Sequence, residues 1–334
     1  MEKRNYNIEV LRVISFMFVI VVHSANYYCE EFGRIIGKQF AFAYFINVCA
    51  RVCVPCFFMI SGALLLGREE SVSKCIKRVG KYIRVLVVWS VIYYLYNVYI
   101  MGKDVNLYEV FNKPTEKHLW YLYALIPIMA FLPFFQMICK NMKEEHEKWF
   151  VAIGVYSIII TCFGAEFYYN NVFFGSRPHF ILLFFVGYFI SKRIDKISVH
   201  NSVLVVIFVV SAFINTLFGV YMSYEKGEYC KYGTYYINPF ILCNSIILFI
   251  LVLRIKDGQL ELKGTLKKIV DLVCRYSFGI YLSHILYLDA LKLILDKIYI
   301  PAYIGIPSMI CIVGVVTLGT VWILSKNKIT KMIM

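Results

Sequence analysis

An arginine and a histidine interrupt the long apolar run "IEVLRVISFMFVIVVHSAN" near the start of the chain. Arg12 and His23 are eleven residues apart, which on an α-helix is three turns plus about 20°. They therefore share one face, about 16 Å apart along the axis. Glu9 and Asn26 lie three residues outside this pair and extend the same polar stripe. Imidazole is the usual general base near neutral pH, and guanidinium groups bind phosphate and carboxylate oxygens.

Each residue of the pair also has an ordinary structural interpretation. An arginine near a helix end can extend its head group to the membrane surface, and a histidine can make a structural hydrogen bond to a neighbouring helix. Taken singly, the two interpretations are equally good. Because both residues lie on one face, the pair favours a cavity or a pathway, and Glu9 is close enough to Arg12 for a salt bridge.

Two later apolar segments also carry polar groups. Arg51 begins "RVCVPCFFMISG", in which Pro55 permits a kink and frees a backbone carbonyl. Arg51 therefore either lines a polar path or pairs with a carbonyl at a helix end. In "RYSFGIYLSHIL", Ser277, Tyr281 and His284 fall on one side of a helix. A structural role is the favoured interpretation for Tyr281 and His284, and shaping a cavity is the alternative.

Two more segments have competing explanations. "HLWYLYALIP" places His118 and Trp120 at a membrane interface, where a belt of aromatic residues is the ordinary explanation. The basic segment at residues 68–84 is explained equally well by attraction to anionic lipid head groups or by binding of an anionic ligand such as coenzyme A. "CVPC" has redox or metal-site spacing. Its apolar helical context favours packing instead, and we expect no metal.

The composition requires a membrane around these residues. The chain has 334 residues, of which 60% are hydrophobic and 17% charged, and its mean hydropathy is +0.68. Soluble domains are about 45–50% apolar and about 25% charged. We predict an all-α, polytopic membrane protein made of a single domain, residues 1–334. The predicted spans are 8–28, 41–67, 82–101, 118–139, 149–164, 177–191, 200–221, 236–254, 272–294 and 303–325.

The net charge of +14 is explained by membrane topology. With the N-terminus inside, the inner segments hold about 22 Lys and Arg residues and the outer segments about 9, as the positive-inside rule requires. We therefore predict that both termini are cytoplasmic, that the protein lies in the plasma (inner) membrane in contact with its lipids, and that nucleic acid is no partner. The first span lacks a small-residue cleavage site and is expected to remain as the first helix.

Together these motifs resemble the membrane acyltransferase-3 family, which includes O-acetyltransferases of bacterial surface polysaccharides. The R-x10-H pair Arg12 and His23, preceded by Glu9, is followed in order by five further segments. They are "RVCVPCFFMISGALLL", "KRVGKYIRVLVVW", "HLWYLYALI", "FFVGYFI" and "YSFGIYLSHIL". The pair alone is a weak signal, whereas six segments in the family's order form a strong one.

The resemblance implies about ten membrane helices, a cytoplasmic acyl-coenzyme A donor such as acetyl-CoA, and an acceptor hydroxyl on the other side of the membrane. It implies that His23 is the essential histidine and that Arg12 is its motif partner. Arg78, Lys81 and Arg84 match the basic donor-side segment. This chain reads "KYIRVLVVW" where relatives commonly have Arg-Ile and then proline.

We therefore expect a membrane O-acyltransferase acting on an envelope glycan or a lipid-linked sugar. His23 would act as the general base, with direct transfer and an acyl-histidine intermediate both open. Arg12, held by Glu9, and Arg51 would serve the donor side. His118, Trp120, Tyr281 and His284 would serve the acceptor side. A transporter or flippase of sugar intermediates is the alternative, because intramembrane ionisable residues also mark transport pathways, and a sensing module with a vestigial site is a third possibility.

Overall fold

A computed structural model describes residues 5–105, 113–162, 178–327, 330 and 332–333. Helices make up most of these residues, and no β-strand occurs among them, which confirms the all-α prediction. The chain forms two compact units. The first unit comprises residues 1–64 and 144–319, and the second comprises residues 65–143 and 320–334.

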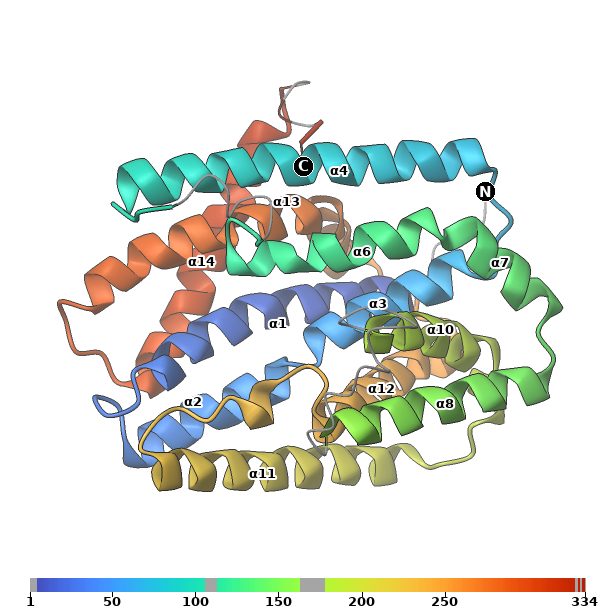
Figure 1. Cartoon of the computed structure of the whole chain (residues 1–334), viewed down its shortest axis with the longest axis horizontal. Helices are drawn as coiled ribbons and strands as arrows, with labels where there is room; N and C mark the ends of the chain where they lie inside the picture. The colour runs from blue at the N-terminus through green and yellow to red at the C-terminus, as the bar shows by residue number, and fades with distance from the viewer. Residues whose placement is uncertain (1–4, 106–112, 163–177, 328–329, 331, 334) are drawn as a thin grey trace. The chain divides into compact units, whose positions relative to one another are not determined.

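The first unit contains most of the long helices. They are α1 (Tyr6–Glu30), α2 (Gly37–Ala50), α3 (Cys53–Leu65), α8 (Glu144–Cys162), α10 (Pro178–Lys192), α11 (Asn201–Lys226), α12 (Pro239–Leu253), α13 (Gly264–Leu295) and α14 (Ala302–Leu324). The last residue of α3 and the residues of α14 after Gly319 belong to the second unit. Helix α1 packs against α2, α12 and α13, and α11 packs against α2 and α12 (Figure 1). Helix α1, which carries the polar stripe, is therefore in contact with three other helices.

The second unit is built on one long helix. Helix α4 (Val72–Leu95) continues into a π-helical turn, η1 (Tyr96–Ile100), and packs against α6 (Trp120–Ala130) and α7 (Leu132–Asn141). A short 3-10 turn, η2 (Lys117–Leu119), precedes α6. Helices α6 and α7 form a pair bent by 57°. Pro133 contributes to this break because it has no N–H to bond a carbonyl one turn earlier.

Within the described residues, seven helical segments are long and apolar enough to span a membrane, and the bent α6–α7 pair counts as an eighth if it is taken as one span. The seven are Tyr6–Glu30, Gly37–Leu65, Val72–Ile100, Asn201–Lys226, Tyr232–Leu253, Gly264–Leu295 and Ala302–Leu324. Of the two remaining predicted spans, 149–164 falls on α8 and ends outside the described residues, and 177–191 falls on the shorter α10. The polytopic character is confirmed; the number ten and the cytoplasmic termini stay predictions.

A two-residue turn at Arg51 and Val52 separates α2 from α3. Its cause lies four residues after Arg51: Pro55 has no backbone N–H, so it cannot bond to the Arg51 carbonyl as a helix would require. Helical bonding resumes with the Cys56 amide, which donates to the Val52 carbonyl at 3.1 Å. The kink expected at Pro55 is thus present as a break just before it. Cys53 and Cys56 lie buried in α3 as unbridged thiols.

Two glycines allow α3 and α10 to touch through their backbones. A Cβ atom added to Gly62 would lie 1.6 Å from the Phe184 carbonyl oxygen, and one added to Gly187 would lie 2.1 Å from the Met59 carbonyl oxygen. Small residues at helix crossings are the common device for close packing in membranes, where van der Waals contact drives helix association.

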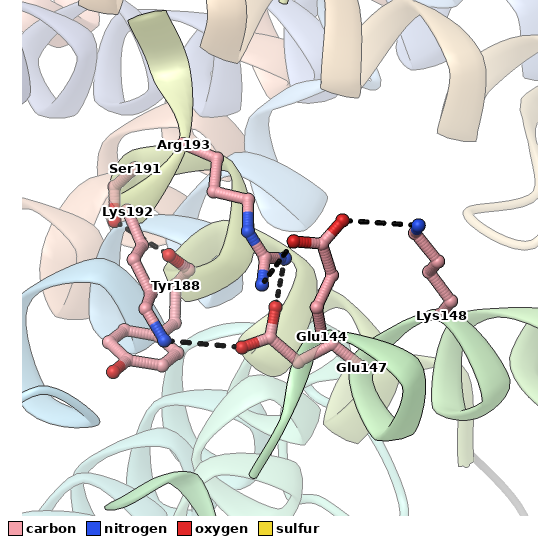
Figure 2. A network of polar contacts seen from close by, with 7 residues as sticks. All are labelled: Glu144, Glu147, Lys148, Tyr188, Ser191, Lys192 and Arg193. Carbon is pink, nitrogen blue, oxygen red and sulfur yellow. Dashed lines mark hydrogen bonds and ion pairs between the residues drawn. The ribbon is translucent and has the colours of Figure 1, made fainter. Parts of the chain in front are cut away.

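An ion network joins the start of α8 to the end of α10 (Figure 2). Glu147 is buried, with 2% of its side chain exposed, and it pairs with both Lys192 and Arg193. Glu144 lies between Arg193 and Lys148, with its carboxylate 3.1 Å from the Lys148 ammonium nitrogen. Because a buried carboxylate is costly without a cation, this network ties the two helix ends together.

Candidate functional site

Helix α1 carries the predicted polar stripe on one uninterrupted helix. The Asn5 side chain caps the helix by accepting hydrogen bonds from the amides of Asn7 and Ile8. Arg12 Nη1 lies 2.8 Å from Glu9 Oε2, which confirms the expected salt bridge, and Glu9 is buried. At this end of α1 the guanidinium is therefore held in place by a carboxylate of its own helix.

His23, further along the stripe, faces a second histidine. The rings of His23 and His284 are 5.1 Å apart between centroids and tilted by 57°. His284 lies on α13, is fully buried, and its Nδ1 atom is 2.6 Å from the Tyr281 carbonyl oxygen. A carbonyl only accepts, so Nδ1 carries the proton, and in the neutral ring Nε2 carries the lone pair. The backbone thus fixes both the tautomer and the orientation of the ring beside His23.

Arg51 lies at the His23 end of α1 as well. Its Nε donates to Asn47 Oδ1 at 2.8 Å, and its Nη2 donates to Asn26 Oδ1 at 3.3 Å. The guanidinium carbon lies 5.2 Å from the centre of the Tyr236 ring, a cation–π distance. Tyr229 adds a hydroxyl that donates to Asn26 at 3.3 Å. We call these five residues, Arg51, Asn26, Asn47, Tyr229 and Tyr236, the Arg51 cluster.

The position of Arg51 differs from the expected donor path. Asn26 is fourteen residues after Arg12, which is about 21 Å along α1, and only one turn beyond His23. The Arg51 guanidinium therefore contacts the opposite end of the stripe from Glu9 and Arg12. A donor role for Arg51 stays a prediction that these contacts do not favour.

The second unit holds the three basic residues of the predicted donor-side segment, Arg78, Lys81 and Arg84. Arg78 is half-buried and pairs with Glu70, whose Oε2 lies 2.7 Å from Arg78 Nη1 and whose side chain is 5% exposed. The hydrogen bond from Arg78 lowers the pKa of Glu70 below its ordinary value. Lys81 and Arg84 lie on the same helix, α4, with exposed side chains. Arg78 is thus already engaged by a carboxylate, whereas Lys81 and Arg84 are accessible.

The two candidate acceptor residues of the second unit differ in environment. His118 lies in η2, is 4% exposed, and makes an edge-on contact with Tyr93 at 5.0 Å between ring centroids. Trp120 begins α6, half-buried, with its ring next to that of Tyr121. His118 is therefore packed into the interior, and an interface position suits Trp120 better.

The structure thus assembles the predicted residues in groups. Glu9 joins Arg12, and His23 joins His284, which is next to Tyr281. In the Arg51 cluster, the sequence placed Asn26 on the stripe but did not predict its contact with Arg51. It did not single out Asn47, Tyr229 or Tyr236. Asn47 precedes Arg51 by one helical turn and could have been found by spacing. The two tyrosines come from a distant segment, between α11 and α12, and local spacing does not reveal them.

The chain is a multi-pass membrane protein, and its apolar helices enclose polar groups. These groups include the His23–His284 pair and Arg12, which is held by Glu9. The chain matches the model of the acyltransferase-3 family, described as an acyltransferase domain, over residues 5–326. The chain belongs to this family, as the six sequence segments predicted.

Relatives of known name are distant. The chain is 24% identical over 307 residues to a probable poly-beta-1,6-N-acetyl-D-glucosamine export protein of Staphylococcus aureus strain MRSA252, a match that covers 87% of this chain and 84% of the relative. The protein of the same name from strain MSSA476 is 23% identical, with the same coverage. No solved structure matches the chain.

Proposed function

We propose that this protein is a membrane O-acyltransferase that moves an acetyl or similar acyl group from acyl-coenzyme A to a hydroxyl of an envelope glycan or lipid-linked sugar. The observation that carries this proposal is the His23–His284 pair on the polar face of α1. Acyl transfer from a thioester to an alcohol needs a base with a pKa near 7, and imidazole is the usual choice. Membership of an acyltransferase family supports the same chemistry.

In this proposal His23 removes the proton of the acceptor hydroxyl as its oxygen attacks the thioester carbonyl carbon. The C–S bond then breaks, and the coenzyme A thiolate leaves and takes up the proton. His284 acts as a positioning residue, because its Nδ1–H is fixed by the Tyr281 carbonyl. Arg12, held by Glu9, serves the donor side of the stripe.

The names of the relatives bear on the acceptor. They are named for export of poly-β-1,6-N-acetylglucosamine, a polymer whose sugar rings carry free hydroxyls. We infer that the acceptor is an amino-sugar glycan of this kind. The same names favour a second candidate function, export of the glycan without acyl transfer, since ionisable residues inside a membrane also line transport paths.

One experiment separates the two functions. The purified protein in lipid nanodiscs is given radiolabelled acetyl-CoA, with and without β-1,6-linked N-acetylglucosamine oligosaccharides. Acyl transfer predicts free coenzyme A and label on the oligosaccharide, both dependent on the acceptor. The same protein in liposomes is tested for oligosaccharide passage without an acyl donor. Oligosaccharide passage in the liposomes, together with no release of coenzyme A in the nanodisc assay, would replace acyl transfer by export.

Substitutions of His284 that keep only one of its two ring nitrogen positions test its positioning role. Asparagine at this position keeps a donor for the Tyr281 carbonyl but removes the Nε2 atom, so His284→Asn is expected to lower kcat by about tenfold to a hundredfold, as small misplacements of a base do. His284→Gln should retain more activity, because its amide reaches the position of Nε2. Steady-state kinetics with acetyl-CoA check this order. Equal activity of the asparagine variant and the unaltered protein would return His284 to a packing role.

The Arg78–Glu70 pair allows donor binding to be separated from structure. If Arg78 binds donor phosphate, Arg78→Ala should raise the KM for acetyl-CoA more than the KM for the acceptor, whereas Glu70→Gln should leave donor KM unchanged or lower. If Arg78 only pairs with Glu70, the two variants should behave alike.

The direction of the Glu70 pKa shift determines how the Arg78–Glu70 pair responds to pH. Because the pKa of Glu70 is lowered in the folded state, the pair's contribution is complete above the ordinary glutamate pKa of about 4.3 and is lost only as the pH falls through the lowered value. Glu70→Gln should therefore not change the shape of a rate profile between pH 6 and 8.

A further inference from the structure

The proposed reaction leaves one charge without a partner. When the hydroxyl attacks the thioester, the electrons of the C=O bond move to the carbonyl oxygen, which becomes an oxyanion. Donors fixed near that oxygen usually give the largest single part of the catalytic effect. Arg12 does not suit this role, because it lies about 16 Å along α1 from His23. A second donor must therefore be sought at the His23 end of the stripe.

We propose that Arg51, oriented by Asn47 and Asn26, stabilises the oxyanion formed at His23. This inference rests on the proposed acyl transfer. Asn26, which accepts from Arg51 Nη2, follows His23 by one helical turn on the same stripe. The guanidinium therefore contacts the stripe one helical turn beyond the proposed base, at the same end of α1 as His23.

The surroundings of Arg51 leave its positive charge uncompensated by acid. Among the residues that the structure describes, no carboxylate lies within ion-pair distance of the Arg51 guanidinium, in contrast to Arg12, Arg78 and Arg193. Its partners are the amide oxygens of Asn47 and Asn26 and the face of Tyr236. Neutral partners orient a guanidinium without cancelling its charge, which suits a group that must meet an anion that exists only transiently.

The helix break supports the same arrangement. Arg51 forms the C-cap of α2, in the two-residue break before α3 begins at Cys53. Both Arg51 and His23 are only half-buried, whereas Asn47 and Ser24, next to them in sequence or in contact, are buried. Arg51 and His23 thus retain accessible surface, as do Asn26, Tyr229 and Tyr236 of the same cluster.

Every bond and proton in the acyl-transfer step is accounted for. The hydroxyl oxygen bonds to the carbonyl carbon, its proton moves to His23, and the oxyanion is held by Arg51. Collapse restores the C=O bond, breaks the C–S bond and returns the proton to the coenzyme A thiolate. No oxidant, reductant or metal is needed.

Two substitutions test this role, one by removing the positive charge of Arg51 and the other by neutralising it. Arg51→Ala should lower kcat by about 10²–10³-fold, with KM for acetyl-CoA and for the oligosaccharide changed less than about threefold, and guanidinium ions added in solution should restore part of the rate. Asn47→Asp keeps the oxygen that accepts from Arg51 Nε, adds a negative charge, and loses the 3.3 Å hydrogen bond that Asn47 Nδ2 donates to Asn26. It should hold the arginine at least as firmly and yet lower kcat by roughly tenfold or more, because the charge is neutralised.

A purely structural arginine would give the reverse result for Asn47→Asp. In that case the stronger ion pair would leave kcat unchanged or raise thermal stability with full activity, and this outcome would overturn the inference. Arg254→Ala is the matched control, since Arg254 donates to Val199 and Asn201 and belongs to neither proposed site. It should leave kcat intact. If the unaltered protein itself transfers no acyl group, the proposed function fails; if it does and Arg51→Ala retains its kcat, only the assignment of Arg51 fails.

Discussion

Replacing His23 by alanine is expected to lower the rate of acyl transfer by about 10²–10⁴-fold, the usual contribution of a general base. Binding of acetyl-CoA should survive, because the proposed donor contacts lie elsewhere. The measurement is release of coenzyme A by the purified protein with acceptor present, together with the binding of donor by calorimetry. Loss of turnover with retained donor affinity is the expected combination.

The matched control is His146→Ala, which removes an exposed histidine on α8. Its rate should equal that of the unaltered protein. Retention of transfer by His23→Ala within about threefold of the control would exclude His23 as the base. Glycan passage that continues in this variant while acyl transfer stops would show two separable activities.

The second large effect concerns the crossing of α3 and α10. Alanine at Gly62 or Gly187 would place a methyl group 1.6 Å or 2.1 Å from a backbone oxygen of the facing helix. Overpacking a core typically costs about 1–3 kcal/mol, and here the obstacle is backbone, which no rotamer change relieves. We therefore expect more than about 3 kcal/mol of destabilisation, seen as a lower midpoint of thermal unfolding in detergent or loss of folded protein.

Gly80→Ala provides the control for this prediction. A Cβ at Gly80 meets open space on α4, and alanine is favoured over glycine in a helix by about 1 kcal/mol. This variant should be neutral or slightly more stable. Similar unfolding midpoints for Gly62→Ala and Gly80→Ala would show that α3 and α10 can separate at little cost.

The sequence predicted what depends on spacing along one helix. The shared face of Arg12 and His23, the salt bridge to Glu9 and the weak point created by Pro55 all follow from helical geometry and from the missing proline N–H. These features depend only on residues within about three turns of one another along the chain. They needed no knowledge of how the helices pack.

Contacts between distant segments could not be predicted in this way. Periodicity shows which side of a helix is polar but not which helix faces it, so the pairing of His23 with His284 and the tyrosines beside Arg51 came from the structure. The same reason explains why spacing alone could not place Arg51 along the stripe. An arginine at a helix break could face either end of the stripe, and only its contact with Asn26 identifies the end.

The ion network of α8 and α10 has a consequence for how the chain enters the bilayer during synthesis. Glu147 is translated well before Lys192 and Arg193, so for that interval the carboxylate has neither of the two cations that pair with it in the folded protein. Glu147 precedes the predicted span 149–164, and Lys192 and Arg193 follow the predicted span 177–191, so the three charges lie at the same end of the two helices. Because a buried carboxylate needs its cations, we expect Glu147 to become buried only after α10 has been inserted beside α8.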